Sequence, residues 1–413
     1  MKLNKLFLFL MFIQLIAGCG GGGGSSTPQT NSGGGSGGSG SSGTASNVLG
    51  ITVNNPSYPN EPTVSVTVCA PGSTTNCQTI NNILLDTGSY GLRIFSQNLS
   101  NVSLTQVNAG SGSLAECVAY EDGSGDWGPV QIADVVLGGE TASNVPIQVI
   151  DATYFANAIP NACKPPNVTS LDQSPSTSGF NGILGVGLFA NDCGPGCASS
   201  ANNGIYYACS GSSCAGTAVP LTNQVYNPVA LLTKDNNGVI VNLPSVPLGG
   251  ESLVTGQLIL GIATESNNSP SGVVAYPANS NGEFTTVFNG STLSDSFIDS
   301  GSNGLFFNAP ASLLPLCSSS SLGDGWYCAQ PTQTLNATTE GYNSSPSSSV
   351  SFQIGDASNL FSNTSNSVFA ELGGPAPSGS GFDWGLPFFF GRTVYVGIGG
   401  TNSTLGSGPY WAY

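Results

Sequence analysis

Apolar residues in this 413-residue chain fall mostly into short runs that alternate with stretches of Gly, Pro, Ser and Asn. The apolar runs Ile83–Leu85 and Phe297–Ile298 and the longer stretch Val130–Leu137 are typical of β-strands, and turn residues follow them. Glycine (58 residues) and proline (26 residues) make up about a fifth of the chain, which suits a fold with many turns. The pattern therefore predicts an all-β protein.

The N-terminus has a different pattern. Lys2 and Lys5 precede the apolar run Leu6–Ile16, and Cys19 follows shortly after. A short basic segment before about eleven apolar residues is typical of a secretory signal and is too short to span a bilayer. The ending Ile-Ala-Gly-Cys resembles a bacterial lipobox, which implies a signal peptide over residues 1–18 and a lipid anchor on Cys19. An ordinary signal peptide with a chance cysteine is the alternative.

Residues 20–46 are almost entirely Gly, Ser, Thr and Asn. Such a segment cannot bury apolar surface, so we expect residues 19–46 to be a lipid-anchored, flexible tether. Gly20 stands where the likeness to known lipoproteins associates an aspartate with inner-membrane retention. This implies an exported lipoprotein at the outer membrane of a Gram-negative bacterium, on its periplasmic face or on the cell surface.

The charge composition excludes several functions. The chain has 6 Lys and Arg against 22 Asp and Glu, a formal net charge of −16 and no histidine. Nucleic-acid binding is therefore not expected, and His-dependent nucleophilic catalysis and His-ligated metal sites are excluded. A Ser–Lys dyad through Lys164 or Lys234 is an alternative, but both lysines are expected at the surface. So few ion pairs also predict that little stability is lost at acid pH.

Ten cysteines remain after Cys19, and an even number in an exported protein points to disulfides. Local spacing predicts four pairs, and the fifth is left by elimination: Cys69–Cys77, Cys193–Cys197, Cys209–Cys214, Cys317–Cys328 and Cys117–Cys163. A zinc site formed by closely spaced cysteines is the alternative.

The most informative feature is a segment that occurs twice. Asp86–Ser89 reads Asp-Thr-Gly-Ser, and Asp299–Ser302 reads Asp-Ser-Gly-Ser 213 residues later, each after an apolar run. A repeat at this distance predicts two duplicated lobes rather than a short-period solenoid. Each aspartate would end a buried strand, and the glycine two positions on lets backbone amides approach the carboxylate. Two unrelated structural turns are the alternative.

Here the sequence resembles the pepsin-like aspartic proteases and, within that likeness, a family of bacterial pepsin-like lipoproteins. Besides the two loops, the likeness rests on four further blocks: Tyr120–Gly125 as a flap hairpin, Gly182–Gly187 behind the first loop, residues 227–261 between the lobes, and Phe382–Tyr395 behind the second loop. The resemblance implies a bilobal fold with a central active-site cleft, an N-terminal lobe over residues 47–245 and a C-terminal lobe over 246–413.

The resemblance also implies roles for individual residues. Asp86 and Asp299 would be the catalytic pair, sharing one proton and activating a water without a cofactor. Tyr120 would cap the cleft from the flap, unless it is an exposed hairpin aromatic. Four hydroxyl residues would support the aspartates through hydrogen bonds between the loops or to the carboxyl oxygens: Thr87, Ser89, Ser300 and Ser302. Two glycines would keep the loops sharp, the second also leaving room for substrate: Gly88 and Gly301.

The sequence departs from the family pattern in three places. Ser300 replaces the commoner Thr, which the superfamily tolerates. Asp383 and Trp384 stand where two aliphatic residues are usual, which affects the packing expected behind Asp299. A basic prosegment that could occlude the cleft is not expected before Val48, because lysine and arginine occur only at positions 2, 5, 93, 164, 234 and 392.

The leading hypothesis is a membrane-anchored, monomeric aspartic endopeptidase that acts on peptides or proteins. The first alternative is a catalytically silent pepsin-like lipoprotein whose cleft binds peptide or glycan. The second is a surface structural or adhesion protein, which low charge would suit but which gives no reason for the paired aspartate loops. Both aspartates being present favours the enzyme.

Overall fold

The computed structural model describes residues 45–377 and 379–413. The predicted signal peptide, the Cys19 anchor and nearly all of the predicted tether lie outside these residues. Within the described part, strands greatly outnumber helices, which confirms the predicted all-β class. No helix in this part of the chain is long and apolar enough to cross a membrane.

Most strands belong to one extended system of hydrogen-bonded β-structure. Its members are β1 (Val48–Val53), β2 (Pro62–Cys69), β3 (Cys77–Asp86), β4 (Tyr90–Phe95), β5 (Thr105–Gln106), β6 (Asn108–Ala109), β7 (Gly112–Ala119), β8 (Ser124–Leu137), β9 (Glu140–Ile150), β10 (Ser170–Leu171), β11 (Gly182–Val186), β12 (Tyr206–Ser210), β13 (Ser213–Gly216), β14 (Gly238–Leu243), β15 (Val254–Leu260), β16 (Ala275–Pro277), β24 (Arg392–Gly397) and β27 (Tyr410–Ala412).

A second sheet is built from the C-terminal part of the chain. It contains β17 (Phe284–Phe288), β18 (Ser291–Ile298), β19 (Leu305–Phe306), β20 (Cys328–Glu340), β21 (Ser347–Asp356), β22 (Gly373–Gly374) and β23 (Asp383–Trp384), and a small hairpin pairs β25 (Asn402–Ser403) with β26 (Gly406–Ser407). The helices are short: α1 (Pro175–Ser178), α2 (Pro195–Ser199), α3 (Ala357–Ser362) and the 3₁₀ turns Ser96–Asn98, Ala156–Ala158, Asn161–Cys163, Leu221–Asn223, Pro228–Leu231 and Leu386–Phe389.

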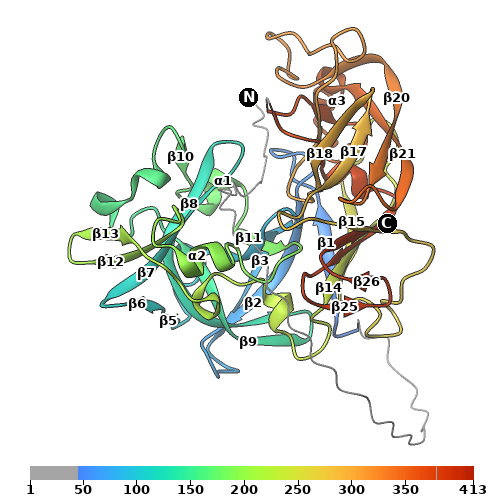
Figure 1. Ribbon diagram of the computed structural model, residues 1–413. Helices are drawn as coiled ribbons and strands as arrows, with labels where there is room; N and C mark the ends of the chain where they lie inside the picture. Colours follow the sequence, from blue (N-terminus) through green and yellow to red (C-terminus); the bar gives the residue numbers. More distant parts are fainter. Residues whose placement is uncertain (1–44, 378) are drawn as a thin grey trace, which may run out of the picture.

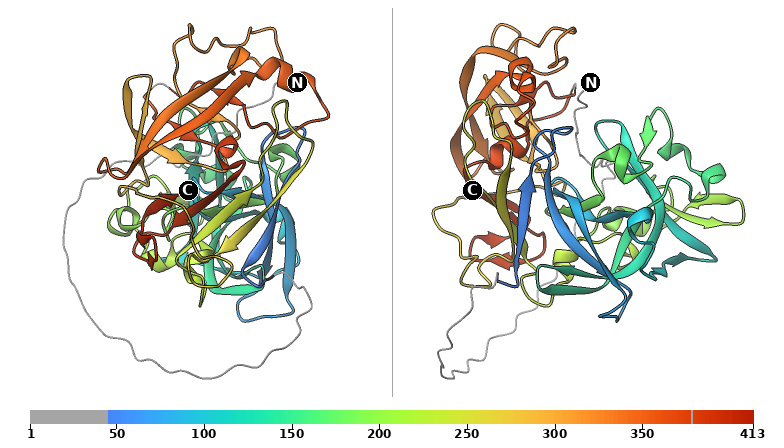
Figure 2. Two further views of the ribbon diagram at one scale, coloured as in Figure 1. Left: turned by 90° about the vertical axis from the view of Figure 1, so that its right-hand side faces the viewer. Right: turned by 180° about the vertical axis from the view of Figure 1, so that it is seen from behind.

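The molecule has two lobes. Strands β7, β8, β12 and β13 gather on one side, and β17, β18, β20 and β21 on the other (Figure 1). The view from behind in Figure 2 shows the same separation. Between the lobes, β14 pairs with both β15 and β24, and β15 pairs with β1. The predicted lobe boundary at residues 245/246 therefore falls between two antiparallel partners, and segments from both sides of it share one sheet.

The two copies of the repeat have the same local topology. Strand β11 runs parallel to β3, with Leu184 opposite Leu85. Strand β23 runs parallel to β18 in the same way, with Trp384 opposite Ile298. In each copy a third strand, β4 or β19, pairs antiparallel with the strand behind the loop. This duplicated arrangement confirms the bilobal, pepsin-like fold class predicted from the repeat.

One apolar core extends through both lobes and lies directly behind the two loops. Trp384 is fully buried, stacks on Phe382 with ring centroids 4.0 Å apart, and donates a hydrogen bond from Nε1 to Thr286 Oγ1 (3.0 Å). The indole thus fills the space behind Asp299 and satisfies its own polar atom. A tryptophan in place of an aliphatic residue is therefore compatible with a packed second loop.

All five predicted disulfides are present, namely Cys69–Cys77, Cys117–Cys163, Cys193–Cys197, Cys209–Cys214 and Cys317–Cys328. The one group of potential metal ligands among the described residues consists of Cys317, Cys328 and Asp356. Because both of its sulfurs are joined in a disulfide, they are not the thiolates that bind zinc. The disulfide interpretation of the cysteines is confirmed.

Buried carboxyl groups predict that this protein is most stable at acid pH. Burial raises the pKa of Glu61 from 4.5 to about 8, although Asn55 donates a hydrogen bond to it, and burial raises that of Asp172 to about 8. The folded state therefore binds these protons more tightly than the unfolded state. Their stabilising contribution is complete below the unfolded pKa and is lost as pH rises through about 8.

Urea unfolding at several pH values tests this prediction. We expect the free energy of unfolding to fall between pH 5 and pH 8, by at most ~1.4 kcal/mol per pH unit for each such proton. Replacing Glu61 by Gln removes one titrating proton and should flatten the dependence. A wild-type protein that gains stability over this range, or a Glu61→Gln variant with the unchanged slope, would contradict the assignment.

Candidate active site

The two repeated loops meet at the junction of the lobes. Asp86 ends β3, and Asp299 follows β18 directly. Both side chains are fully buried, and their carboxyl groups lie close enough to interact directly. Two aspartates that lie 213 residues apart in sequence thus form a pair inside the molecule.

Reciprocal hydrogen bonds join the loops. The backbone N–H of Thr87 donates to Ser300 Oγ (3.1 Å), and the N–H of Ser300 donates to Thr87 Oγ1 (2.9 Å). Each hydroxyl then donates across the junction, from Thr87 Oγ1 to the carbonyl of Ile298 (3.0 Å) and from Ser300 Oγ to the carbonyl of Leu85 (2.7 Å). The four bonds are related by the internal symmetry and fix one loop relative to the other.

Each carboxyl group accepts a matching pair of hydrogen bonds from its own loop. Oδ1 accepts from the glycine two positions on, at 2.8 Å for Gly88 N–H to Asp86 and 2.7 Å for Gly301 N–H to Asp299. Oδ2 accepts from the serine that follows, Ser89 for Asp86 and Ser302 for Asp299 (3.0 Å in the second loop). These donors hold both carboxyl planes in place and favour the ionised form.

The glycines are required by the close approach of the loops. A Cβ atom on Gly88 would lie 2.5 Å from Cγ of Asp299, and one on Gly301 would lie 2.9 Å from Oδ1 of Asp86. Any side chain at either position would therefore push the carboxyl groups apart.

The two aspartates differ in their electrostatic surroundings. Burial raises the pKa of Asp86, while hydrogen bonds from Asp299 and Ser89 and the nearby Arg93 guanidinium oppose the rise. Burial raises the pKa of Asp299 further, and the Asp86 and Asp383 carboxyls add to the rise. Both pKa values are therefore raised by burial, and Asp299 has more neighbouring carboxyl groups that favour its protonated form.

A buried ion cluster lies next to Asp86 on β4. The Arg93 guanidinium donates to Glu116 Oε1 (2.9 Å), lies 3.4 Å from Asp192 Oδ2, and donates to the carbonyl of Tyr90 (2.8 Å). The side chains of Arg93, Glu116 and Asp192 are completely buried. The charge of Arg93 therefore balances buried carboxyls and also lowers the pKa of Asp86.

The hairpin of β7 and β8 turns at residues 120–123, where the flap was expected. Tyr120 is buried in the apolar core, and its hydroxyl donates to Asp126 Oδ2 (2.7 Å). The exposed aromatic considered as an alternative is therefore wrong. Tyr120 also does not line the cavity beside the aspartates, whereas Glu121, the next residue, does. The expected contact between the flap and the cleft is made by Glu121.

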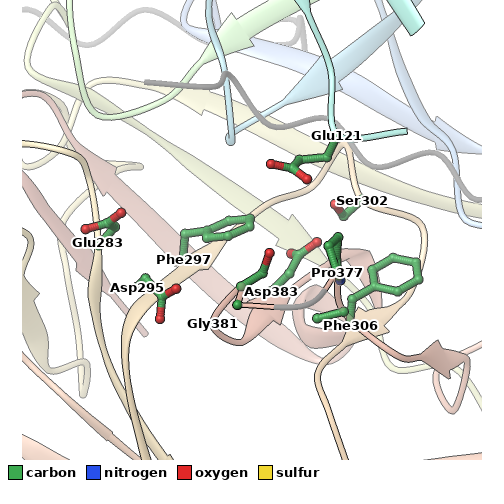
Figure 3. A pocket seen from close by; sticks show the side chains of 12 residues that line it. Glu121, Glu283, Asp295, Phe297, Ser302, Phe306, Pro377, Gly381 and Asp383 are labelled. Atoms are coloured by element: carbon green, nitrogen blue, oxygen red, sulfur yellow. The ribbon is translucent and has the colours of Figure 1, made fainter. Parts of the chain in front are cut away.

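A cavity of about 210 Å³ lies beside the second loop, between the flap turn and β23 (Figure 3). Ser302 forms part of its wall and also donates a hydrogen bond to Asp299, so a single residue separates the cavity from that aspartate. The rings of Phe297 and Phe306 form an apolar part of the cavity wall. Four acidic residues also line it: Glu121, Glu283, Asp295 and Asp383.

Comparison with known proteins gives a family and a structural neighbour. A family model described as "Protein of unknown function (DUF3443)" matches residues 43–413. The chain belongs to this family. No curated protein matches it. Among solved structures it is similar to the aspartic proteinase from Irpex lacteus, with 15% sequence identity and a TM-score of 0.47, over 88% of this chain and 96% of that chain.

In this DUF3443 chain, the sequence located both aspartates and the six loop residues that surround them. It did not identify Arg93 or the acidic lining of the cavity. For Arg93 a signal was present, because it is the one charged residue in the run Tyr90–Phe95, which is otherwise apolar or glycine. For Glu283 and Asp295 no signal exists, since distant segments bring them to the cavity only in the folded chain.

Proposed function

We propose that this protein is an aspartic endopeptidase in which Asp86 and Asp299 activate water for the hydrolysis of peptide bonds. The observation that supports the proposal most directly is the symmetric joining of the two aspartate loops by reciprocal hydrogen bonds. A structural turn needs no second copy of itself at hydrogen-bond distance. A buried carboxyl pair is also costly to folding, which favours a chemical role.

In the proposed mechanism, ionised Asp86 takes a proton from a water molecule as the water oxygen attacks the peptide carbonyl carbon. Protonated Asp299 donates a hydrogen bond and then its proton to the carbonyl oxygen, so a neutral tetrahedral intermediate forms. Asp86, now protonated, gives its proton to the amide nitrogen while Asp299 takes one back from a hydroxyl of the intermediate, and the C–N bond breaks to give a carboxylic acid and an amine. Thr87 and Ser300 keep the two carboxyl groups in register throughout.

Pepstatin-sensitive cleavage is the test of this function. We expect the protein, produced in an oxidising compartment, to cleave an unfolded protein between pH 3 and pH 7. Activity should fall below the lower macroscopic pKa of the pair, where no base remains, and above the higher one, where no acid remains. Folded protein that cleaves nothing across this range would favour the silent module, whose cleft binds peptide or glycan.

We also propose that the enzyme is anchored by lipid on Cys19 at the outer membrane, with residues 20–46 as its tether. The lipobox-like sequence and the Gly-rich composition support this part of the proposal. Cell fractionation tests it: the wild-type chain should be recovered with outer membranes, and a Cys19→Ala variant should not. Equal distribution of the two chains would contradict it.

A further inference from the structure

The acidic cavity beside the second loop contains one residue that breaks the internal symmetry. In the first lobe, Ile183 on β11 lies opposite Leu84, two residues before Asp86. In the second lobe, Asp383 on β23 lies opposite Phe297, two residues before Asp299. Ile183 is fully buried apolar core, and Asp383 is only 4% exposed. The second lobe thus carries a buried carboxyl where the first carries an aliphatic side chain.

Asp383 has no hydrogen-bond partner for either carboxyl oxygen among the described residues. The Ser302 hydroxyl lies close to it, but that hydroxyl has one proton and donates it to Asp299. An unpartnered buried carboxyl destabilises a fold, which points to a partner beyond the described residues. Figure 3 shows Asp383 between Phe297 and Phe306, in the wall of the cavity.

The rest of the cavity matches a cation with an apolar stem. Glu121 reaches it from the flap and Asp295 from β18, and none of the described residues that line it is a lysine or arginine. The rings of Phe297 and Phe306 offer apolar surface of the kind that covers the methylene groups of long basic side chains. Its volume of about 210 Å³ is several times the ~30 Å³ share of one water molecule, which suits a whole side chain.

We propose that this cavity is a subsite for a lysine or arginine side chain of the peptide substrate, with Asp383 as the residue that pairs with its charge. The inference rests on the proposed function and deepens it by naming the substrate class. Because Ser302 contacts both the cavity and Asp299, the bound side chain belongs to a residue close to the bond that is cleaved. Glu121 then places a second carboxyl over the same charge when the flap lies over the peptide.

The test compares alanine-rich peptides that carry one lysine, moved from position to position, with the same peptides carrying norleucine. Norleucine keeps the alkyl stem and removes the charge. Calorimetric binding to the full chain carrying Asp86→Asn measures affinity without turnover. At one position we expect the lysine peptide to bind at least about tenfold more tightly than the matching norleucine peptide. A close, desolvated charge pair contributes at least ~1.4 kcal/mol to binding.

Three further variants identify the source of the preference. Asp383→Asn should abolish the preference for lysine. Glu121→Gln, at a half-buried position on the flap turn, should reduce this preference about threefold even if the Asp383 variant does not fold. Asp324→Asn removes the same charge from an exposed site in the C-terminal part of the chain and should leave the preference for lysine unchanged. Equal affinity for the two peptides, or a preference that survives both Asp383→Asn and Glu121→Gln, would overturn the subsite.

Cleavage by the wild-type chain separates this inference from the proposed function. If peptides are cleaved without any advantage for lysine, the subsite is wrong and the endopeptidase stands. If no peptide is cleaved but lysine peptides bind through Asp383, the endopeptidase is wrong and the cavity remains a binding site for basic peptides.

Discussion

Replacing either aspartate of the pair by asparagine is expected to lower kcat/KM for peptide cleavage at least about a thousandfold, the scale of a lost general acid or base. Asp86→Asn removes the base that accepts a proton from water, and Asp299→Asn removes the acid that protonates the carbonyl oxygen. The double variant should be little worse than either single variant, because the two carboxyls act as one unit.

The fold should survive these substitutions. The asparagine carbonyl can still accept the hydrogen bond from the N–H of Gly88 or Gly301, and its NH2 group can donate to the hydroxyl of Ser89 or Ser302. Unfolding curves and near-ultraviolet circular dichroism should therefore match the wild type, and Asp324→Asn provides an exposed control that keeps full activity. A kcat/KM within tenfold of the wild-type value in both single variants would contradict the proposed mechanism.

Replacing Arg93 by methionine is expected to destabilise the fold by about 3–5 kcal/mol, the usual consequence of removing one partner from a buried ion pair. Glu116 and Asp192 would remain buried without their cation, and their side chains are fully inaccessible to water. Methionine keeps most of the volume, so a cavity contributes little to the loss. Urea unfolding at neutral pH measures the effect.

Lys234→Met is the matched control. Lys234 pairs with Glu265, but the lysine side chain is 56% exposed, so the loss should be at most about 1 kcal/mol. Arg93→Lys keeps the charge but lacks the planar guanidinium group. Its loss of stability should lie between those of Arg93→Met and Lys234→Met. If Arg93→Met costs no more than Lys234→Met, the buried cluster is not the stabilising feature described above.

The agreement between sequence and structure was best where a local pattern carried the information. The repeated Asp-Thr/Ser-Gly-Ser loops, the short apolar strands and the even number and close local spacing of the cysteines led to an all-β, two-lobed fold, a pair of aspartates and five disulfides. Each of these depends on residue type and on spacing within a few residues, or on one long repeat. Such features can be recognised without knowing where the rest of the chain lies.

Agreement was weaker where a side chain's surroundings come from distant segments. Tyr120 was located on the flap turn, but its contact with Asp126 and its burial in the core follow from how the hairpin packs on the N-terminal lobe. Asp383 was recognised as a departure from the family pattern. Its lack of a partner became visible only when Ser302 was seen to donate to Asp299 instead.

The sequence by itself determined the class of fold, the duplication and the identity of the two aspartates, because strand periodicity and a repeated motif are local properties. Only the tertiary structure decided which charges surround each aspartate, why Arg93 is buried, and which acids line the cavity beside the second loop. Proton affinity and charge recognition depend on burial and on distances between residues far apart in the chain, and folding alone sets those quantities.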